Sequence, residues 1–177
     1  MYKNKLKYTI INTLQEVDRE ASDAISELSS FYATSEVVYT EKMNIHGCIG
    51  CNDCWLKTPG ICSIKDDYEK IFIKLLRSDR VIFITETKLG FVSCKMKNIL
   101  DRLLPMLTMY LTIKDGQMRH CSRYDVSVDM GLLFKGDGDA EYLSLWMERV
   151  TLNIHSKSFG AYVIGDRKEL FHALGNN

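Results

Sequence analysis

The sequence has no net charge and no long apolar run. Its 23 Lys and Arg residues balance 23 Asp and Glu residues, so the formal net charge at pH 7 is zero. Proteins that bind nucleic acid or an anionic membrane surface usually carry a basic excess or a basic patch. We therefore expect neither nucleic acid nor membrane as a partner. No stretch approaches the roughly 18 consecutive apolar residues that a membrane-spanning helix needs.

Repeats, low-complexity tracts and a secretion signal are also missing. The N-terminal residues MYKNKLKYTIINT are basic, but their apolar run is too short for a signal peptide. We therefore expect a cytoplasmic protein. In that reducing compartment, clustered cysteines indicate metal or redox chemistry more often than disulfides. The length of 177 residues and the hydrophobic content of 46% are ordinary for one globular domain, predicted to span residues 1–177.

Four of the six cysteines lie close together in a segment predicted to be a loop, residues 46–65. Thiolates two residues apart can turn onto one centre, and this spacing is typical of an iron–sulfur cluster. A structural zinc ion, with His46 substituting as one of its ligands, is an alternative, and reduced thiols without a metal are a third. The spacing favours the cluster. The candidate ligands are Cys48, Cys51, Cys54 and Cys62.

Strand and helix patterns alternate along the chain. Because parallel neighbouring strands need crossover connections, the alternation predicts an α/β fold. We expect a three-layer, doubly wound, five-stranded parallel sheet that is flavodoxin-like, with strand order 2-1-3-4-5. The expected strands are Tyr8–Ile11, Val37–Tyr39, Val81–Ile84, Tyr124–Phe134 and Phe159–Ile164. The expected helices are approximately Val17–Leu28, Tyr68–Leu76, Ser93–Leu107, Leu143–Ile154 and Asp166–Leu174.

Three loops are expected at the carboxyl edge of this sheet, where ligands bind in such folds. They are Asn12–Asp18, the cysteine segment 46–65 inserted after the second strand, and Thr85–Phe91. We expect residues 112–123 to be a polar excursion with a turn at Asp115-Gly116.

Several charged residues are interpreted as structural rather than catalytic. The acidic pair Asp66 and Asp67 is expected to cap the helix that follows it. Lys95, Lys97, Asp101 and Arg102 are expected to be surface or capping groups of their helix.

The run from Cys48 to Arg102 resembles the flavodoxin-fold NADPH-dependent FMN reductases, in particular the iron–sulfur flavoproteins among them. The matching motifs are CIGCNDCW, GICSIKDD, SDRVIF and SCKMKNILDRLLP, in this order. The resemblance implies FMN at the strand ends, NAD(P)H as electron donor, and a small-molecule or protein acceptor. It also implies a homodimer or homotetramer. In the iron–sulfur flavoproteins a compact cysteine motif holds a [4Fe-4S] cluster, which implies that the four clustered cysteines are its ligands.

The first loop departs from the pattern of that family. FMN phosphate is typically held by a Gly-Ser-Pro run whose backbone N–H groups face the anion. Residues Asn12–Asp18 contain no glycine and two carboxylates, which would each repel a phosphate by about 1 kcal/mol. The neutral donors that remain as candidate FMN ligands are Thr13, Gln15 and Ser22.

The third loop departs as well, because the proline and aromatic residue usual in the family are replaced. Backbone amides can still contact the flavin ring, and Phe91 or Trp55 can offer a stacking surface. The candidate residues are Thr85, Glu86, Thr87, Lys88, Leu89, Gly90 and Phe91. Two hypotheses follow: a flavin-dependent oxidoreductase, or a flavodoxin-like protein that has lost FMN and serves as a metal-binding or partner-docking subunit.

Overall fold

The computed structural model describes residues 6–31 and 35–175, so the predicted domain of residues 1–177 extends beyond the described residues at both ends. The strands are β1 (Tyr8–Asn12), β2 (Ser35–Tyr39), β3 (Arg80–Lys88), β4 (Phe91–Val92), β5 (Leu107–Lys114), β6 (Gln117–Ser122), β7 (Asp129–Gly136) and β8 (Ser158–Val163). The helices are α1 (Arg19–Phe31), α2 (Asp53–Leu56), α3 (Tyr68–Leu76), α4 (Cys94–Asp101), α5 (Ala140–Asn153) and α6 (Arg167–Gly175), with 3-10 turns at Leu104–Met106 and Ile164–Asp166.

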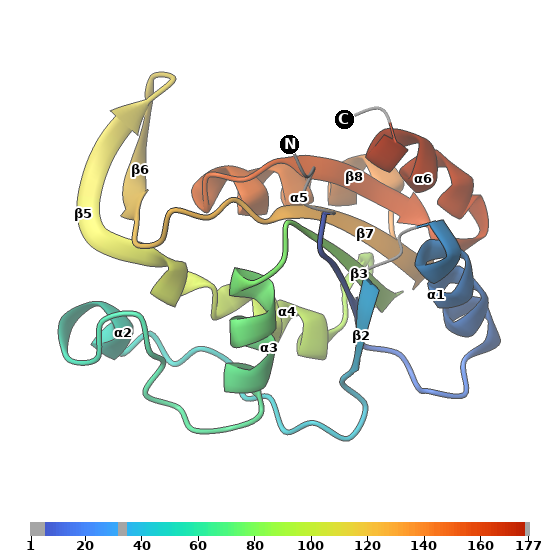
Figure 1. Cartoon of the computed structure of the whole chain (residues 1–177), viewed down its shortest axis with the longest axis horizontal. Helices are drawn as coiled ribbons and strands as arrows, with labels where there is room; N and C mark the ends of the chain where they lie inside the picture. The colour runs from blue at the N-terminus through green and yellow to red at the C-terminus, as the bar shows by residue number, and fades with distance from the viewer. Residues whose placement is uncertain (1–5, 32–34, 176–177) are drawn as a thin grey trace, which may run out of the picture.

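The central sheet has the predicted topology. Five parallel strands lie in the order β2-β1-β3-β7-β8, which is the 2-1-3-4-5 order of a flavodoxin-like fold. Residues of β3 alternate between two cores: Val81 and Phe83 pack with α3, α4 and α5, whereas Ile82 and Ile84 pack with α1 and α6. The continuous apolar run of β3 is thus explained by helices on both faces of the sheet, as Figure 1 shows.

The expected loop Thr85–Phe91 is mostly a strand. β3 continues to Lys88, the chain turns at Leu89-Gly90, and β4 pairs back in antiparallel fashion. Both turn residues have left-handed backbone angles, with φ of 54° and 74°. Two-residue hairpin turns need that conformation. Leucine is unusual at the first turn position, which is why the sequence did not indicate a hairpin there.

The polar excursion expected over residues 112–123 belongs to a hairpin. β5 and β6 make a separate two-stranded sheet around the predicted turn at Asp115-Gly116. Figure 1 shows this hairpin projecting at the upper left, on the same side as the cysteine segment. Two further expected elements are shorter than predicted. The helix expected over Ser93–Leu107 ends at Asp101, before the 3-10 turn that contains Pro105, and the strand expected over Tyr124–Phe134 begins at Asp129.

Among the helices of the described residues, none is both long and apolar enough to cross a bilayer.

Candidate functional site

All four clustered cysteines contribute to the wall of one small hollow. Besides Cys48, Cys51, Cys54 and Cys62, the hollow is bounded by Leu104 and Pro105 from the 3-10 turn after α4 and by the side chain of Arg102. The chain can turn this tightly because Gly50 and Asn52 adopt left-handed backbone angles, with φ of 66° and 60°. The sequence expectation that these four residues gather is consistent with this arrangement.

Arg102 holds the cysteine segment together from inside. Its side chain is 1% exposed. One terminal nitrogen donates to Asp66 Oδ2 (2.6 Å) and to the carbonyl of His46 (3.2 Å), and the other donates to Cys62 Sγ (3.4 Å) and the carbonyl of Ile64 (3.1 Å). The expectation that Arg102 is a surface group is therefore wrong, whereas its capping role is confirmed because Arg102 is the C-cap residue of α4. It is a buried cation that joins both ends of the segment.

Asp66 is the counter-ion of Arg102, and its side chain is also 1% exposed. Burial opposes its ionisation, but hydrogen bonds from Arg102, from the backbone N–H groups of His46 and Tyr68 and from the His46 ring outweigh this effect. They lower the pKa of Asp66 from 3.8 to about 2. The predicted capping role is thus only part of its role. The carboxylate receives the N–H of Tyr68 at the start of α3, and it also neutralises a buried guanidinium.

The donor set around the hollow suits an anionic cluster. Nowhere in residues 6–31 and 35–175 are three His, Cys, Asp or Glu side chains arranged to hold a single metal ion. A single zinc ion needs its sulfurs within about 4 Å of one another, because each Zn–S bond is about 2.3 Å long. A four-iron cluster accepts a wider spacing, because each cysteine binds a different iron atom. Burial, reinforced by Cys62, Cys48 and Cys51, raises the pKa of the Cys54 thiol. Beside these thiols, Arg102 Nε–H is buried without a hydrogen-bond partner among the described residues.

The cysteines do not lie at the carboxyl edge of the sheet, contrary to the expectation for the three loops. Helix α4 begins at that edge, where the Ser93 hydroxyl lies 2.9 Å from the Thr85 hydroxyl. It ends at Asp101, and the following residue, Arg102, donates to Cys62 Sγ. Eight helical residues span about 12 Å, so roughly one helix length separates the cysteine hollow from the strand ends. The chain that leads from β2 to this segment starts at the edge, where Lys95 donates to the carbonyls of Thr40 and Glu41, and then runs away from it.

The loop after β1 satisfies its own backbone donors. The N–H of Leu14 donates to Asn12 Oδ1 (3.0 Å), that of Glu16 to Glu41 Oε2 (2.9 Å), and that of Ala21 to Asp18 Oδ1 (3.0 Å). These amides surround the start of α1, where FMN phosphate binds in the family that the sequence resembles. In this loop two carboxylates and one amide oxygen accept backbone N–H groups that a phosphate would otherwise use.

The candidate FMN residues of the first loop are only partly brought together. The Thr13 hydroxyl donates to the Thr85 hydroxyl (2.8 Å) and to the carbonyl of Ile84 (3.1 Å). Gln15 and Ser22 are exposed. The structure adds a residue that the sequence did not indicate, Lys135 at the end of β7, which is ion-paired with Asp18. A cation at the end of the fourth parallel strand was the signal available for it.

Some of the candidate FMN residues on β3 and β4 line a hollow, and others lie on the surface. Glu86 and Thr87 help to line an open hollow of about 490 Å³ at the carboxyl edge, together with Lys135, Gly136 and residues 163–165. Lys88 is paired with Glu86, and Leu89 in the turn with Gly90 is 98% exposed. The Phe91 ring packs against Trp146, with 4.8 Å between ring centroids.

Trp55 is not available as a stacking surface for a ligand at the strand ends. Its indole N–H donates to the carbonyl of Leu104 (2.8 Å), and its ring lies 4.5 Å from that of His120 on β6. It connects the cysteine segment with the projecting hairpin.

Comparison with known proteins gives consistent results. An iron–sulfur flavoprotein of Methanocaldococcus jannaschii is 34% identical over 88 residues, which are 50% of this chain and 43% of the relative. The match therefore spans less than half the length of that relative. No family model matches the chain.

Solved structures share the fold at low identity. RosB with a bound 8-demethyl-8-formylriboflavin-5'-phosphate superimposes with a TM-score of 0.63 at 14% identity, covering 89% of this chain and 64% of RosB. The NAD(P)H:quinone oxidoreductase of Methanothermobacter marburgensis gives 0.57 at 17% identity, covering 98% and 95%. The predicted resemblance is confirmed: this chain is similar in sequence to iron–sulfur flavoproteins and has the flavodoxin-like fold.

Proposed function

We propose that this protein is an electron-transferring oxidoreductase that carries a [4Fe-4S] cluster on Cys48, Cys51, Cys54 and Cys62. The observation that carries the proposal is the gathering of these four thiols around one hollow beside the buried guanidinium of Arg102. Four thiolates and a cluster are anionic, and a buried cation with N–H groups directed at sulfur stabilises that charge. Such contacts also set the reduction potential of a cluster.

We also propose that the electrons come from NAD(P)H by way of FMN. The sequence relative is named a flavoprotein, and the hollow at the carboxyl edge is where ligands bind in doubly wound sheets. When bound, FMN supplies the conversion of a hydride into single electrons, which is chemistry of the cofactor rather than of side chains. The residues of this chain that would position its ring are Glu86, Thr87 and Gly136.

A second candidate function is a cluster-carrying subunit without flavin. The specific observation in its favour is the loop after β1, where Asn12, Asp18 and Glu41 already accept the backbone N–H groups near the start of α1. In that case the protein passes electrons between partners through the cysteine site alone.

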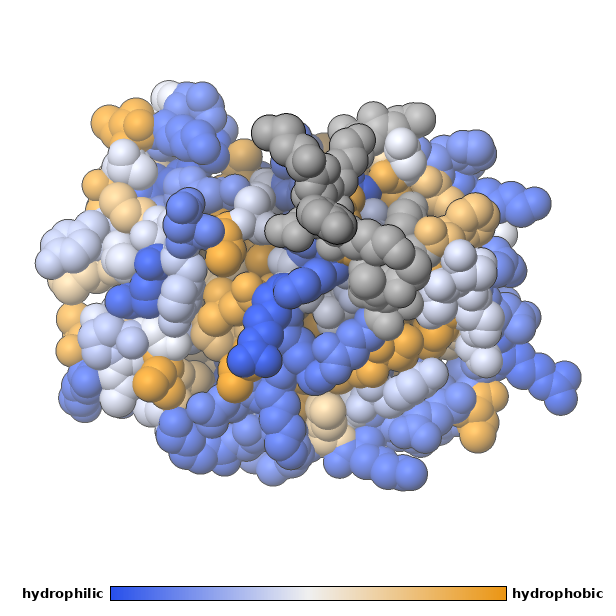
Figure 2. Space-filling model, in the orientation of Figure 1, coloured by the Kyte–Doolittle hydropathy of each residue, from blue (hydrophilic) through white to orange (hydrophobic). Residues whose placement is uncertain are grey.

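We also propose an electron acceptor, a cellular location and an oligomeric state for this protein. The acceptor is a small molecule or a protein, the location is cytoplasmic, and the chain forms a homodimer or homotetramer. A projecting two-stranded hairpin is marginally stable by itself. Figure 2 shows apolar side chains on the hairpin at the upper left. They support its burial between copies of the chain. Its strongly exposed apolar residues are Met109, Leu111, Ile113 and Met118.

Anaerobic purification followed by absorption spectroscopy and iron and flavin analysis tests the proposal. We expect about four irons per chain and a broad iron–sulfur absorption shoulder that Cys51→Ser abolishes. Cys121→Ser, outside the hollow, is the matched control and should keep the shoulder. Iron without flavin, and no uptake of added FMN, would select the second candidate. Protein that contains no iron and cannot be reconstituted with it would overturn both.

A further inference from the structure

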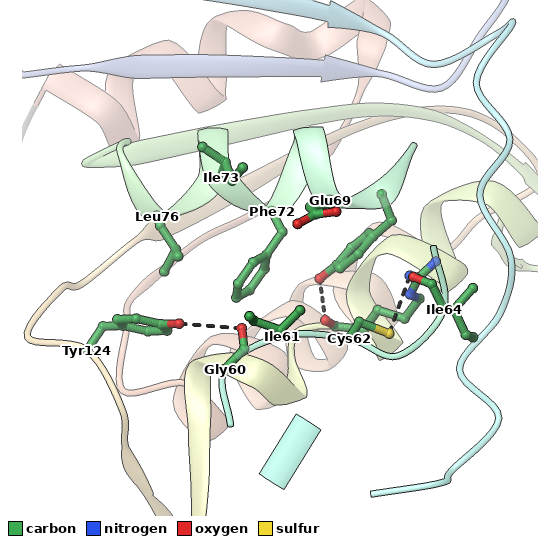
Figure 3. Close-up of a pocket in the computed structure, with 11 residues that line it drawn as sticks. Gly60, Ile61, Cys62, Ile64, Glu69, Phe72, Ile73, Leu76 and Tyr124 are labelled. Carbon is green, nitrogen blue, oxygen red and sulfur yellow. Dashed lines mark hydrogen bonds between the residues drawn. The ribbon is translucent and has the colours of Figure 1, made fainter. Parts of the chain in front are cut away.

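A second cavity lies on the other side of Cys62 from the cysteine hollow. It has a volume of about 190 Å³ and lies between helix α3 and residues 60–64. Figure 3 shows Phe72, Ile73 and Leu76 reaching down from α3 toward Ile61 and Cys62 below. Neither the cluster nor a flavin at the strand ends occupies this space, so the proposed function leaves it unused.

The wall of this cavity is apolar and aromatic. The two hydroxyl groups that border it are already hydrogen-bonded: the Tyr68 hydroxyl donates to the carbonyl of Arg102, and the Tyr124 hydroxyl donates to the carbonyl of Gly60 (3.4 Å). The rings of Tyr68 and Phe72 stack with centroids 5.9 Å apart. Since these hydroxyl protons are engaged, a ligand gains mainly from contact with carbon atoms.

Size and charge narrow the class of ligand. An apolar cavity of about 150 Å³ in another protein binds benzene, so a volume of 190 Å³ accepts one ring with small substituents. The charge of Arg102 is already balanced by Asp66, and the Glu69 carboxylate borders the cavity. A ligand carboxylate would therefore be repelled.

We propose that this cavity binds a small, uncharged, single-ring molecule that makes contact with Cys62. Cys62 and Arg102 line both this cavity and the cysteine hollow, so an occupant lies against a residue of the redox site. The importance of the contact for electron transfer rests on the proposed function, because Cys62 is then a cluster ligand. The binding itself does not depend on it.

The probe for the test is 4-fluorotoluene, observed by fluorine NMR during titration with the purified protein. We expect saturable binding, whereas 4-fluorobenzoate should not bind measurably. Ile61 lines the cavity and is 49% exposed, so Ile61→Trp can fill the opening without entering the core. It should weaken binding at least tenfold. Leu56→Trp, at a similarly exposed residue outside the cavity, is the matched control and should leave the affinity within twofold.

A second measurement uses the unaltered chain and needs no variant to fold. In the iron-free fraction, saturating 4-fluorotoluene should slow alkylation of Cys62 by iodoacetamide at least threefold. The exposed Cys48 and Cys51 should react at unchanged rates. Absence of saturable binding, or equal protection of all three thiols, would overturn the inference. A lack of iron in every preparation would instead overturn the proposed function, and both of these measurements would remain valid.

Discussion

The loops that follow the neighbouring parallel strands β1 and β2 differ in how their charged and polar groups are paired. Residues 12–18 direct carboxylate and amide oxygens at their own backbone N–H groups, and Asp18 is further paired with Lys135. The cysteine segment instead surrounds a buried cation and leaves its thiols along a hollow. The first loop is therefore electrostatically satisfied by the protein itself, whereas the second has a donor set that a metal cluster would complete.

The carboxyl group of Asp18 shows how the protein itself uses hydrogen-bonding positions of the first loop. Burial works against its ionisation, but the hydrogen bond from Lys135 and the backbone N–H of Ala21 prevail and lower the pKa of Asp18. An ionised carboxylate at a helix start occupies the favourable position that a phosphate would otherwise take.

The largest effect is expected from Arg102→Met, which removes the cation from the cysteine segment. Asp66 would be left buried without its counter-ion, and breaking a buried pair in this way costs about 3–5 kcal/mol. Urea denaturation should therefore show a loss of unfolding free energy in that range, and iron retention should fall with it.

Lys97→Met is the matched control for that change. Lys97 lies on the same helix and pairs with Asp101, but both side chains are partly exposed. Exposed helix pairs contribute about 0.5 kcal/mol or less, so the control should be nearly neutral. A loss below 1 kcal/mol for Arg102→Met would show that the cysteine segment does not depend on its buried cation.

Lowering the pH should decrease the free energy of unfolding, by less than the change Arg102→Met does. The pKa of Asp66 is about 2 in the folded chain and 3.8 as the ordinary value. Because the folded pKa is lowered, its contribution is complete above about pH 5 and is lost as the pH falls from about 4 toward 2. The difference corresponds to about 2 kcal/mol. Unfolding free energies measured from pH 6 to pH 2 should show this loss.

Asp66→Asn should remove that part of the pH dependence, since an amide does not titrate. Asp125→Asn, at an exposed carboxylate outside both loops, should leave the steepness of the curve unchanged. Equal steepness in the original chain and in Asp66→Asn would assign the acid sensitivity to other groups.

The sheet could be predicted from the sequence because its signals are local and repeated. The continuous apolar run 81–84 and the helical stripe from Tyr68 to Leu75 each identify one element, and crossover rules then leave few topologies. The hairpin of β3 and β4 was missed because β4 has only two residues. In β5 the apolar residues Leu107, Met109, Leu111 and Ile113 stand at every second position, and this alternation was the signal available for the strand, although most of its side chains are exposed.

The site was predictable in its cysteines and not in what surrounds them. Spacing alone indicated that the four thiols gather. The role of Arg102 depends on a partner 36 residues earlier in the chain, Asp66, and no pattern within α4 reveals it. One signal was present: Arg102 stands three residues after Ile99, on the edge of the apolar stripe of its helix. The pairing of Lys135 with Asp18 spans 117 residues and was equally hidden.

Neutralising the first loop should make it more like a phosphate site. The double change Asp18→Asn and Glu41→Gln removes two negative charges while keeping side chains of similar shape. At about 1 kcal/mol for each charge, the affinity for FMN should rise roughly tenfold to thirtyfold, measured by quenching of flavin fluorescence. Riboflavin, which lacks the phosphate, should gain little. An equal gain for both ligands would show that the carboxylates do not act on the phosphate.

The change with the smallest expected effect tests most directly whether the two loops are independent of each other. Thr13→Val keeps the shape of the side chain but removes hydrogen bonds to Thr85 and Ile84, at a cost of about 1 kcal/mol. Iron content should not change, because the cysteine hollow lies one helix away. The matched change Thr58→Val removes the bond from Thr58 to the Ile61 carbonyl within the cysteine segment (2.8 Å), so it should lower iron content at a similar cost in stability. If Thr13→Val lowered iron content as much as Thr58→Val, the two loops would be coupled through the sheet edge, and their independence would be refuted.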